Sequence, residues 1–101
     1  MLDKLTHEVF SEHVGSTFRI GLEDGGSVDM TLIEATRLGS RSDSGSTAKR
    51  DPFSLLFRAP KETALPQKIY EIEHEGIGSF AMFIVPIGVD DSGTLYEAVF
   101  N

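Results

Sequence analysis

The second half of the chain is divided into four short apolar blocks of strand length, and this pattern limits the possible folds more than any other feature. The blocks are PFSLLFRAP, KIYEIEH, SFAMFIVPIG and TLYEAVFN. Large apolar residues occupy every second position in several of them, as with Phe53, Leu55 and Phe57. Alternation with a period of two is typical of strands that bury one face and expose the other. The sequence therefore predicts a β-rich domain.

The first half predicts a short helix followed by a hairpin. Thr6 is suited to cap the start of a helix, and residues 6–14 are predicted to form a helix that covers one end of the sheet. Apolar residues then alternate over residues 18–22 and again over residues 28–32, on either side of the turn sequence DGG. Glycine readily adopts the positive φ values that tight hairpin turns require, so these two stretches are predicted to pair.

Prolines and adjacent apolar residues mark where the predicted strands end or bend. Pro52 and Pro60 bound the third strand. Pro86 interrupts the fifth strand, which indicates a bulge or a sheet edge that could pair with another chain. Leu32 and Ile33 are adjacent in the second strand and indicate a bulge there as well. Six antiparallel strands with mostly short connections favour a meander that forms a small barrel or a two-sheet sandwich, and the sequence leaves both open.

Length and composition predict one domain over residues 1–101. This length is sufficient for one hydrophobic core and too short for two. The chain has no cysteine, which excludes disulfides and thiolate metal ligands. The sequence MLDKLTHEVF lacks the apolar run of a signal peptide or a membrane helix. We therefore expect no membrane insertion, and a cytoplasmic location unless a secreted or particle-bound partner carries the protein out.

Charge is unevenly distributed. The net charge of −7 opposes binding to nucleic acid, yet residues 37–61 carry a local excess of +4 and include a Ser-rich stretch, residues 39–51, that is predicted to be a mobile loop. A basic segment on an acidic body could attract a partner protein or a second copy of the chain, and a merely solvated loop is the alternative. The candidate partner-binding residues are Arg37, Arg41, Lys49, Arg50, Arg58 and Lys61.

No catalytic, metal or cofactor motif is complete. His7 and His13 are six residues apart, whereas the zinc-protease motif requires a spacing of four. Residues 39–47 resemble a phosphate-binding loop, but the glycines are one residue too far apart and Ser46 replaces the essential lysine. No serine lies in a G-x-S-x-G turn. We therefore predict a protein without enzymatic activity, catalytic residues, cofactor or metal.

The fourth predicted strand carries the polar residues of greatest interest. Glu71, Glu73 and Glu75 share one face, which could bind a cation or a basic partner, although a solvated strand face is the alternative. His74 is in phase with Tyr70 on the opposite face, and we predict a hydrogen-bonded, partly buried histidine.

The sequence resembles an uncharacterised bacterial domain family along nearly its whole length. The resemblance rests on the blocks PFSLLFR, LPQ, FIVPIG and YEAVFN. It departs from the family at Glu75, where proline is frequent, and in its longer Ser-rich loop. The resemblance implies a stand-alone protein, often encoded beside proteins with phage-tail-collar domains, and it transfers no functional residue.

Two functional hypotheses follow. The first is a non-enzymatic interaction or assembly module, an accessory to a tail-collar-like fibre protein, with a protein partner or self-association. The alternative is a small-molecule-binding barrel or minor enzyme with a site near Tyr70, Glu73 and His74.

Overall fold

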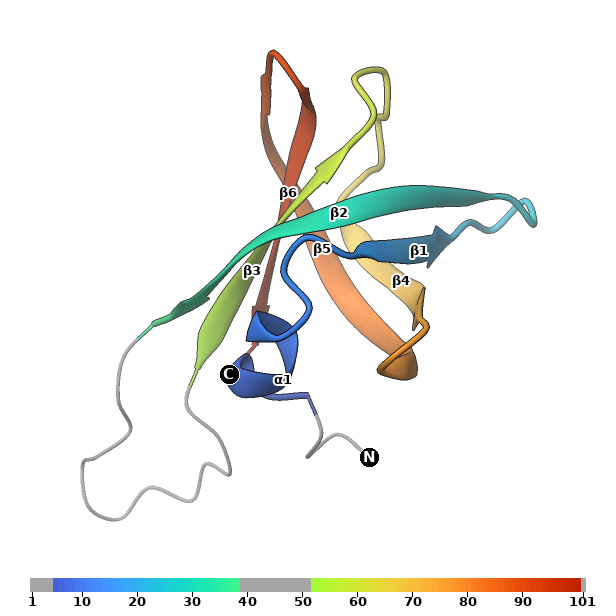
Figure 1. Cartoon of the computed structure of the whole chain (residues 1–101). Helices are drawn as coiled ribbons and strands as arrows, with labels where there is room; N and C mark the ends of the chain where they lie inside the picture. The colour runs from blue at the N-terminus through green and yellow to red at the C-terminus, as the bar shows by residue number, and fades with distance from the viewer. Residues whose placement is uncertain (1–4, 39–51, 101) are drawn as a thin grey trace.

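Six antiparallel strands close into a small barrel, and one short helix lies beside one end of it (Figure 1). The computed structural model describes residues 5–38 and 52–100. This architecture confirms the predicted all-β fold class and selects the barrel over the sandwich. The elements are α1 (His7–Ser11), β1 (Thr17–Gly21), β2 (Ser27–Arg37), β3 (Phe53–Ala59), β4 (Lys68–His74), β5 (Gly78–Asp90) and β6 (Gly93–Phe100).

The strand order around the barrel is β1-β2-β3-β6-β5-β4, and β4 pairs with β1 to close it. The barrel therefore consists of two three-stranded meanders, β1-β2-β3 and β4-β5-β6, which are joined by the pairing of β3 with β6 and of β1 with β4. The single meander that the sequence predicted is divided between β3 and β4. Residues 60–67, which we call the connector, lead from one meander to the other. At roughly 3.3 Å per extended residue, a connection of this length can cross the end of a small barrel.

The two longest strands, β2 and β5, each change neighbours along their length. β2 pairs first with β1 and then with β3, and its register shifts between Leu32 and Glu34. β5 pairs first with β4 and then with β6, and its register shifts between Pro86 and Gly88. Both predicted bulges are thereby confirmed. A bulge bends its strand, so each long strand contributes to two walls of the barrel (Figure 1).

The inward-facing side chains fill the barrel, and α1 adds one ring to this core. Phe10 of α1 is fully buried and lies between 5.6 and 6.1 Å, centroid to centroid, from four other phenylalanine rings. These rings belong to Phe18, Phe53, Phe80 and Phe100. The helix is therefore held by the burial of one aromatic side chain, because a helix this short is unstable alone.

Helix α1 ends at Ser11, three residues before the predicted end. The Gly15 amide donates to the Leu32 carbonyl at 2.7 Å, and the Leu32 amide donates to the Ser16 carbonyl at 3.1 Å. These bonds hold Gly15 and Ser16 alongside β2, and a helix that continued to residue 14 would have lost them. Tertiary contacts with β2 are therefore the reason that α1 ends earlier than predicted.

Other local predictions can be compared directly. β3 lies between Pro52 and Pro60, as predicted. The predicted loop of residues 39–51 lies outside the described residues. Within the part of the chain that the structure describes, no helix is long and apolar enough to cross a membrane.

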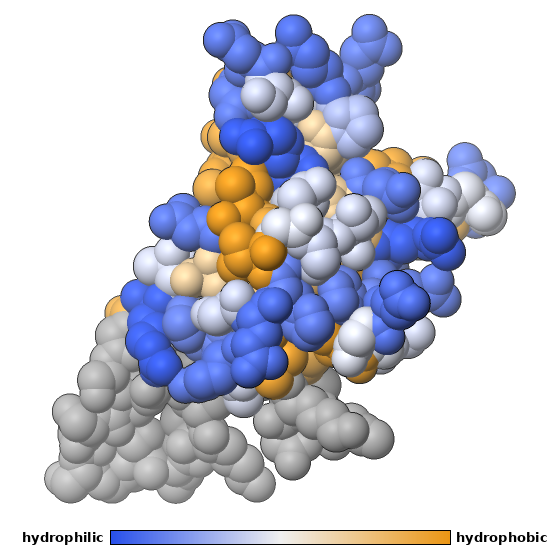
Figure 2. Space-filling model, viewed as in Figure 1, coloured by the Kyte–Doolittle hydropathy of each residue, from blue (hydrophilic) through white to orange (hydrophobic). Residues whose placement is uncertain are grey.

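Figure 2 shows a surface that is largely hydrophilic, with apolar atoms gathered near the crossing of β2 and β3.

Candidate functional site

The structure describes three of the six basic residues that were predicted to bind a partner. Arg37 Nη2 lies 2.6 Å from Glu8 Oε2, and Arg58 Nη2 lies 2.8 Å from Asp90 Oδ2. The hydrogen bond from Arg58 is the main reason that the pKa of Asp90 is lowered. Lys61 belongs to the connector. The basic set as a whole stays a prediction, because three members lie outside the described residues: Arg41, Lys49 and Arg50.

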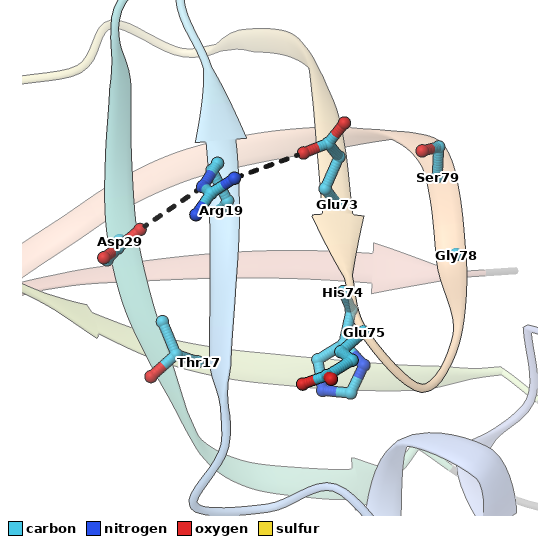
Figure 3. A pocket seen from close by; sticks show the side chains of 8 residues that line it. All are labelled: Thr17, Arg19, Asp29, Glu73, His74, Glu75, Gly78 and Ser79. Atoms are coloured by element: carbon cyan, nitrogen blue, oxygen red, sulfur yellow. Dashed lines mark ion pairs between the residues drawn. The ribbon is translucent and has the colours of Figure 1, made fainter.

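Acidic side chains of β2 and β4 gather on the outer face of the barrel, on either side of β1. Arg19 of β1 lies between two of them, with Nε 4.0 Å from Asp29 Oδ1 and Nη1 3.6 Å from Glu73 Oε1 (Figure 3). Exposed ion pairs of this kind contribute at most about 1 kcal/mol, so they leave the surface adaptable. We call Asp29, Glu71, Glu73 and Glu75 the acidic wall, since each of them lines at least one of the two hollows that contain Arg19.

The acidic wall contains the glutamate row that the sequence predicted on the fourth strand. One hollow of about 480 Å³ is lined by Arg19, Asp29, Glu73, His74 and Glu75, among others. Four carboxylates around a single guanidinium give this wall a negative potential. Among residues 5–38 and 52–100, no group of three or more potential ligand side chains could hold a metal ion.

His74 is buried at the end of β4, and its partners define its protonation. The Gly76 amide donates to Nδ1 at 2.9 Å, so this nitrogen carries no proton. Nε2 must then carry the proton of the neutral ring, and it lies 2.9 Å from Ser16 Oγ. The Ser16 hydroxyl in turn donates to the His13 carbonyl at 2.6 Å. The prediction of a hydrogen-bonded, partly buried histidine is confirmed.

The pKa of His74 reflects this environment. Burial is the main cause that lowers the pKa below its ordinary value of 6.5, and the nearby His13 lowers it further. Glu75 acts in the opposite direction and raises it. Both ring nitrogens of the neutral His74 make hydrogen bonds, so the side chain is suited to a structural role in linking the segments around it.

The three residues of the alternative ligand site are only partly brought together. Glu73 and His74 line the same hollow. Tyr70 lies four residues before His74 on β4, faces the interior, and donates its hydroxyl to the Pro66 carbonyl at 2.6 Å. The Tyr70 hydroxyl therefore anchors the connector and does not line that hollow.

Sequence reasoning missed an apolar feature on the outer wall. Ile69 and Phe83 are opposite each other in the ladder of β4 and β5, and they are 64% and 47% exposed. Each of them lies one position from an inward-facing residue, Tyr70 or Met82, and strand alternation could therefore have predicted that both face outward. Glu71 follows two positions after Ile69 on the same strand face, so this Ile69–Phe83 pair adjoins the acidic wall.

A second apolar feature lies near the start of β4, between the connector and the end of β5. The Leu65 amide donates to the Tyr96 hydroxyl at 2.9 Å, which holds the connector against the barrel. Beside it is an open depression of about 670 Å³, which we call the connector groove. The groove is lined by residues that include Leu65, Pro66, Pro86, Val89 and Tyr96.

Comparison with known proteins identifies the family of this chain and gives no information on its function. The search of curated proteins and the search of solved structures returned no match. A family model described as "Domain of unknown function (DUF6916)" matches residues 5–100. This confirms the resemblance to a domain family of unknown function, whereas the association with tail-collar proteins stays a prediction. Because the match covers almost the whole described chain, the protein belongs to the DUF6916 family.

Proposed function

We propose that this protein is a non-enzymatic interaction module that binds a partner protein through the outer wall of β4 and β5. The observation that carries the proposal is the Ile69–Phe83 pair, an aliphatic and an aromatic side chain that face each other across two strands and remain exposed. Large apolar and aromatic side chains of this kind supply much of the binding energy when a partner covers them.

The acidic wall specifies the chemistry of the partner. It begins at Glu71, next to the Ile69–Phe83 pair, and continues to Asp29 and Glu73. A partner surface with an apolar centre and flanking lysine or arginine residues complements this arrangement, and the opposite charges accelerate encounter. The family resemblance suggests a tail-collar-like fibre protein as this partner, and that identity is part of the proposal.

The test is recovery of the partner from the native host with a chromosomally tagged chain, followed by mass spectrometry. We expect one neighbouring fibre-like protein in stoichiometric amount with the wild-type chain. The double variant Ile69→Ser, Phe83→Ser should lose it, because the apolar contact is removed from solvent-exposed positions at little cost to the core. Val14→Ser is the matched control, since Val14 has the same 47% exposure as Phe83 and lies after α1.

Equal recovery by the double variant and the wild-type chain would overturn this location for the interface. The triple variant Arg41→Ser, Lys49→Ser, Arg50→Ser then tests the basic segment, the candidate partner site that the sequence analysis named. Loss of the partner only in that variant would assign binding to the basic segment.

The alternative, a small-molecule site, is favoured by one observation. Glu73 and His74 line a common hollow with Asp29 and Arg19, and its carboxylates suit a cationic ligand. A thermal-shift screen with a panel of small amines tests this function. A shift that disappears in Glu73→Gln supports it, and no shift with any amine counts against it.

A further inference from the structure

β2 and β5 both extend beyond the strand that precedes them in the chain. Pairing of β2 with β1 ends at Thr31, and pairing of β5 with β4 ends at Ile84. Residues 32–37 and residues 85–90 therefore have a neighbouring strand on one side only, namely β3 and β6. In an antiparallel ladder, alternate residues direct their amide and carbonyl groups to opposite sides. Each extension thus has one backbone edge that the barrel itself does not pair.

The chain covers this edge on β2. The Leu32 carbonyl accepts from the Gly15 amide, and the Leu32 amide donates to the Ser16 carbonyl. Further along the strand, His7 Nε2 lies 3.0 Å from the Ala35 carbonyl oxygen. The segment that contains α1 therefore supplies the hydrogen bonds that a neighbouring strand would have made, and Leu32 is fully buried.

The corresponding edge on β5 is left open by residues 5–38 and 52–100, the part of the chain that the structure describes. Among the described residues, no backbone hydrogen bond joins the connector to residues 85–89. Ile87 is 50% exposed and Val89 is 70% exposed, and the connector groove runs alongside. Proline and bulges often protect edges, and Pro86 removes one amide here. Protection is incomplete, because two β-branched apolar residues follow Pro86 where edge strands commonly carry lysine.

We propose that a second copy of this chain covers the open edge, with the ends of the two β5 strands paired antiparallel about a two-fold axis. An antiparallel strand edge is complementary to itself, which is the requirement of a symmetric dimer. The surface also contains both parts of an apolar contact, since Val89 is 70% exposed where it lines the groove together with Leu65 and Pro66. In the dimer each Val89 packs into the groove of the other copy.

The charges at this surface favour a second copy as the occupant. The chain has a net charge of −7, which opposes self-association in general. Residues 86–89 are uncharged, however, the carboxylate of Asp90 at the end of the extension pairs with Arg58, and the groove residues Lys61 and Glu62 carry opposite charges. The acidic wall lines other hollows, on β1, β2 and β4. Two copies can therefore meet at the β5 edge without bringing their excess negative charge together.

This inference goes beyond the proposed function, because the two use different surfaces. The Ile69–Phe83 pair does not line the connector groove and remains free to bind another protein. Either proposal can fail while the other holds.

The test is the mass of the purified full-length chain as a function of concentration, measured by light scattering and sedimentation equilibrium. We expect the mass to approach twice the 11.1 kDa of one chain. Val89→Lys should weaken the dimer by about a hundredfold or more, because two ammonium groups would enter an apolar interface. Ile69→Lys is the matched control, an outward strand position of similar exposure, and it should leave the dimer unchanged. A mass of one chain up to millimolar concentration overturns the proposal, as does a dimer that Ile69→Lys dissociates and Val89→Lys does not.

Hydrogen exchange of the wild-type chain provides a second measurement that does not depend on any variant. Those amides of residues 87–89 that face the open edge should exchange more slowly as the concentration rises through the dimerisation range, because main-chain pairing protects them. A dimer that forms without this protection uses another surface and refutes the edge pairing.

Discussion

The hydroxyl of Ser16 lies 2.9 Å from Nε2 of His74, although the two residues are 58 positions apart in the sequence. This contact joins the turn after α1 to the end of β4. The Gly76 amide occupies Nδ1, and the ring of His13 packs against the His74 ring with centroids 4.5 Å apart. His74 therefore links the helical end of the chain to the barrel in its neutral form, which makes this junction sensitive to pH.

Stability should fall with acidification because of His74. Its pKa is lowered in the folded protein, so the unfolded chain binds the proton more readily, and its histidine titrates near 6.5. The contribution is complete above 6.5 and is lost progressively as the pH falls below 6.5 toward the lower folded value. Urea unfolding between about pH 7.5 and about pH 5.5 measures this effect as a declining free energy of unfolding.

The variant His74→Gln is the control for that titration. Glutamine keeps an acceptor and a donor but does not titrate, so its free energy of unfolding should decline less over the same range. The stability difference between wild type and variant should therefore shrink as the pH falls. Parallel curves for the two proteins would contradict the role given to His74.

Gly93→Ala should destabilise the barrel strongly. A Cβ at this position would overlap the carbonyl oxygen of Ala59 in the neighbouring strand, and a backbone atom cannot move aside as a side chain can. We expect a loss of about 3 kcal/mol in the free energy of unfolding. Gly21→Ala is the control, because its Cβ would meet the Glu71 carbonyl at an ordinary 3.5 Å. Equal stabilities for the two variants in urea unfolding would show that β3 and β6 are less closely packed here.

Tyr96→Phe should loosen the connector. The variant leaves the Leu65 amide without its acceptor, which typically costs about 1.5 kcal/mol in the free energy of unfolding. Tyr70→Phe should act on the same segment by removing the donor to the Pro66 carbonyl. Limited proteolysis should cut the connector faster in each variant, and fastest in the double variant. Unchanged cleavage in all three proteins would mean that the tyrosine hydroxyls do not hold the connector.

Removal of residues 96–101 should prevent folding. β6 pairs with β3 along its length and with β5 near the hairpin, and it contributes the buried side chains of Tyr96 and Ala98. Without these residues, β3 and β5 lose their shared neighbour and the barrel cannot close. Circular dichroism and the loss of a cooperative thermal transition measure this outcome, with the full-length chain as the control. A cooperative transition in the shortened chain would refute the prediction.

Local features of the fold could be predicted wherever adjacent residues decide them. The alternation in β3 and β4 specifies which side chains face the core, and the structure buries Phe53, Leu55 and Phe57 as predicted. Pro86 and the adjacent pair at Leu32 identify both bulges because a bulge changes the phase of one strand. The inward position of His74 also followed from its alternation with Tyr70, and its hydrogen bonding followed from the general rule that a buried polar ring has partners.

The candidate surfaces were harder to predict, because the exposure of a side chain depends on which strands are neighbours in the barrel. The exposed Ile69–Phe83 pair requires the register of β4 against β5, and neither residue indicates its partner by itself. The basic segment became a candidate because charge is visible in the sequence. In the structure, however, Arg37 and Arg58 pair with Glu8 and Asp90 from other elements. Contacts of this kind join distant residues and leave no local pattern.

The sequence by itself determined the number of strands, their inward faces, the bulges and the helix cap at Thr6, whose hydroxyl accepts from the Val9 amide. These features depend on side-chain phase, φ preference and hydrogen bonds between near neighbours. Only the tertiary structure decided the strand order, the early end of α1, and which strand extension is covered. Those outcomes depend on competition among backbone groups that are far apart in the chain. Among the described residues, the edge of β2 obtained a partner and the edge of β5 did not.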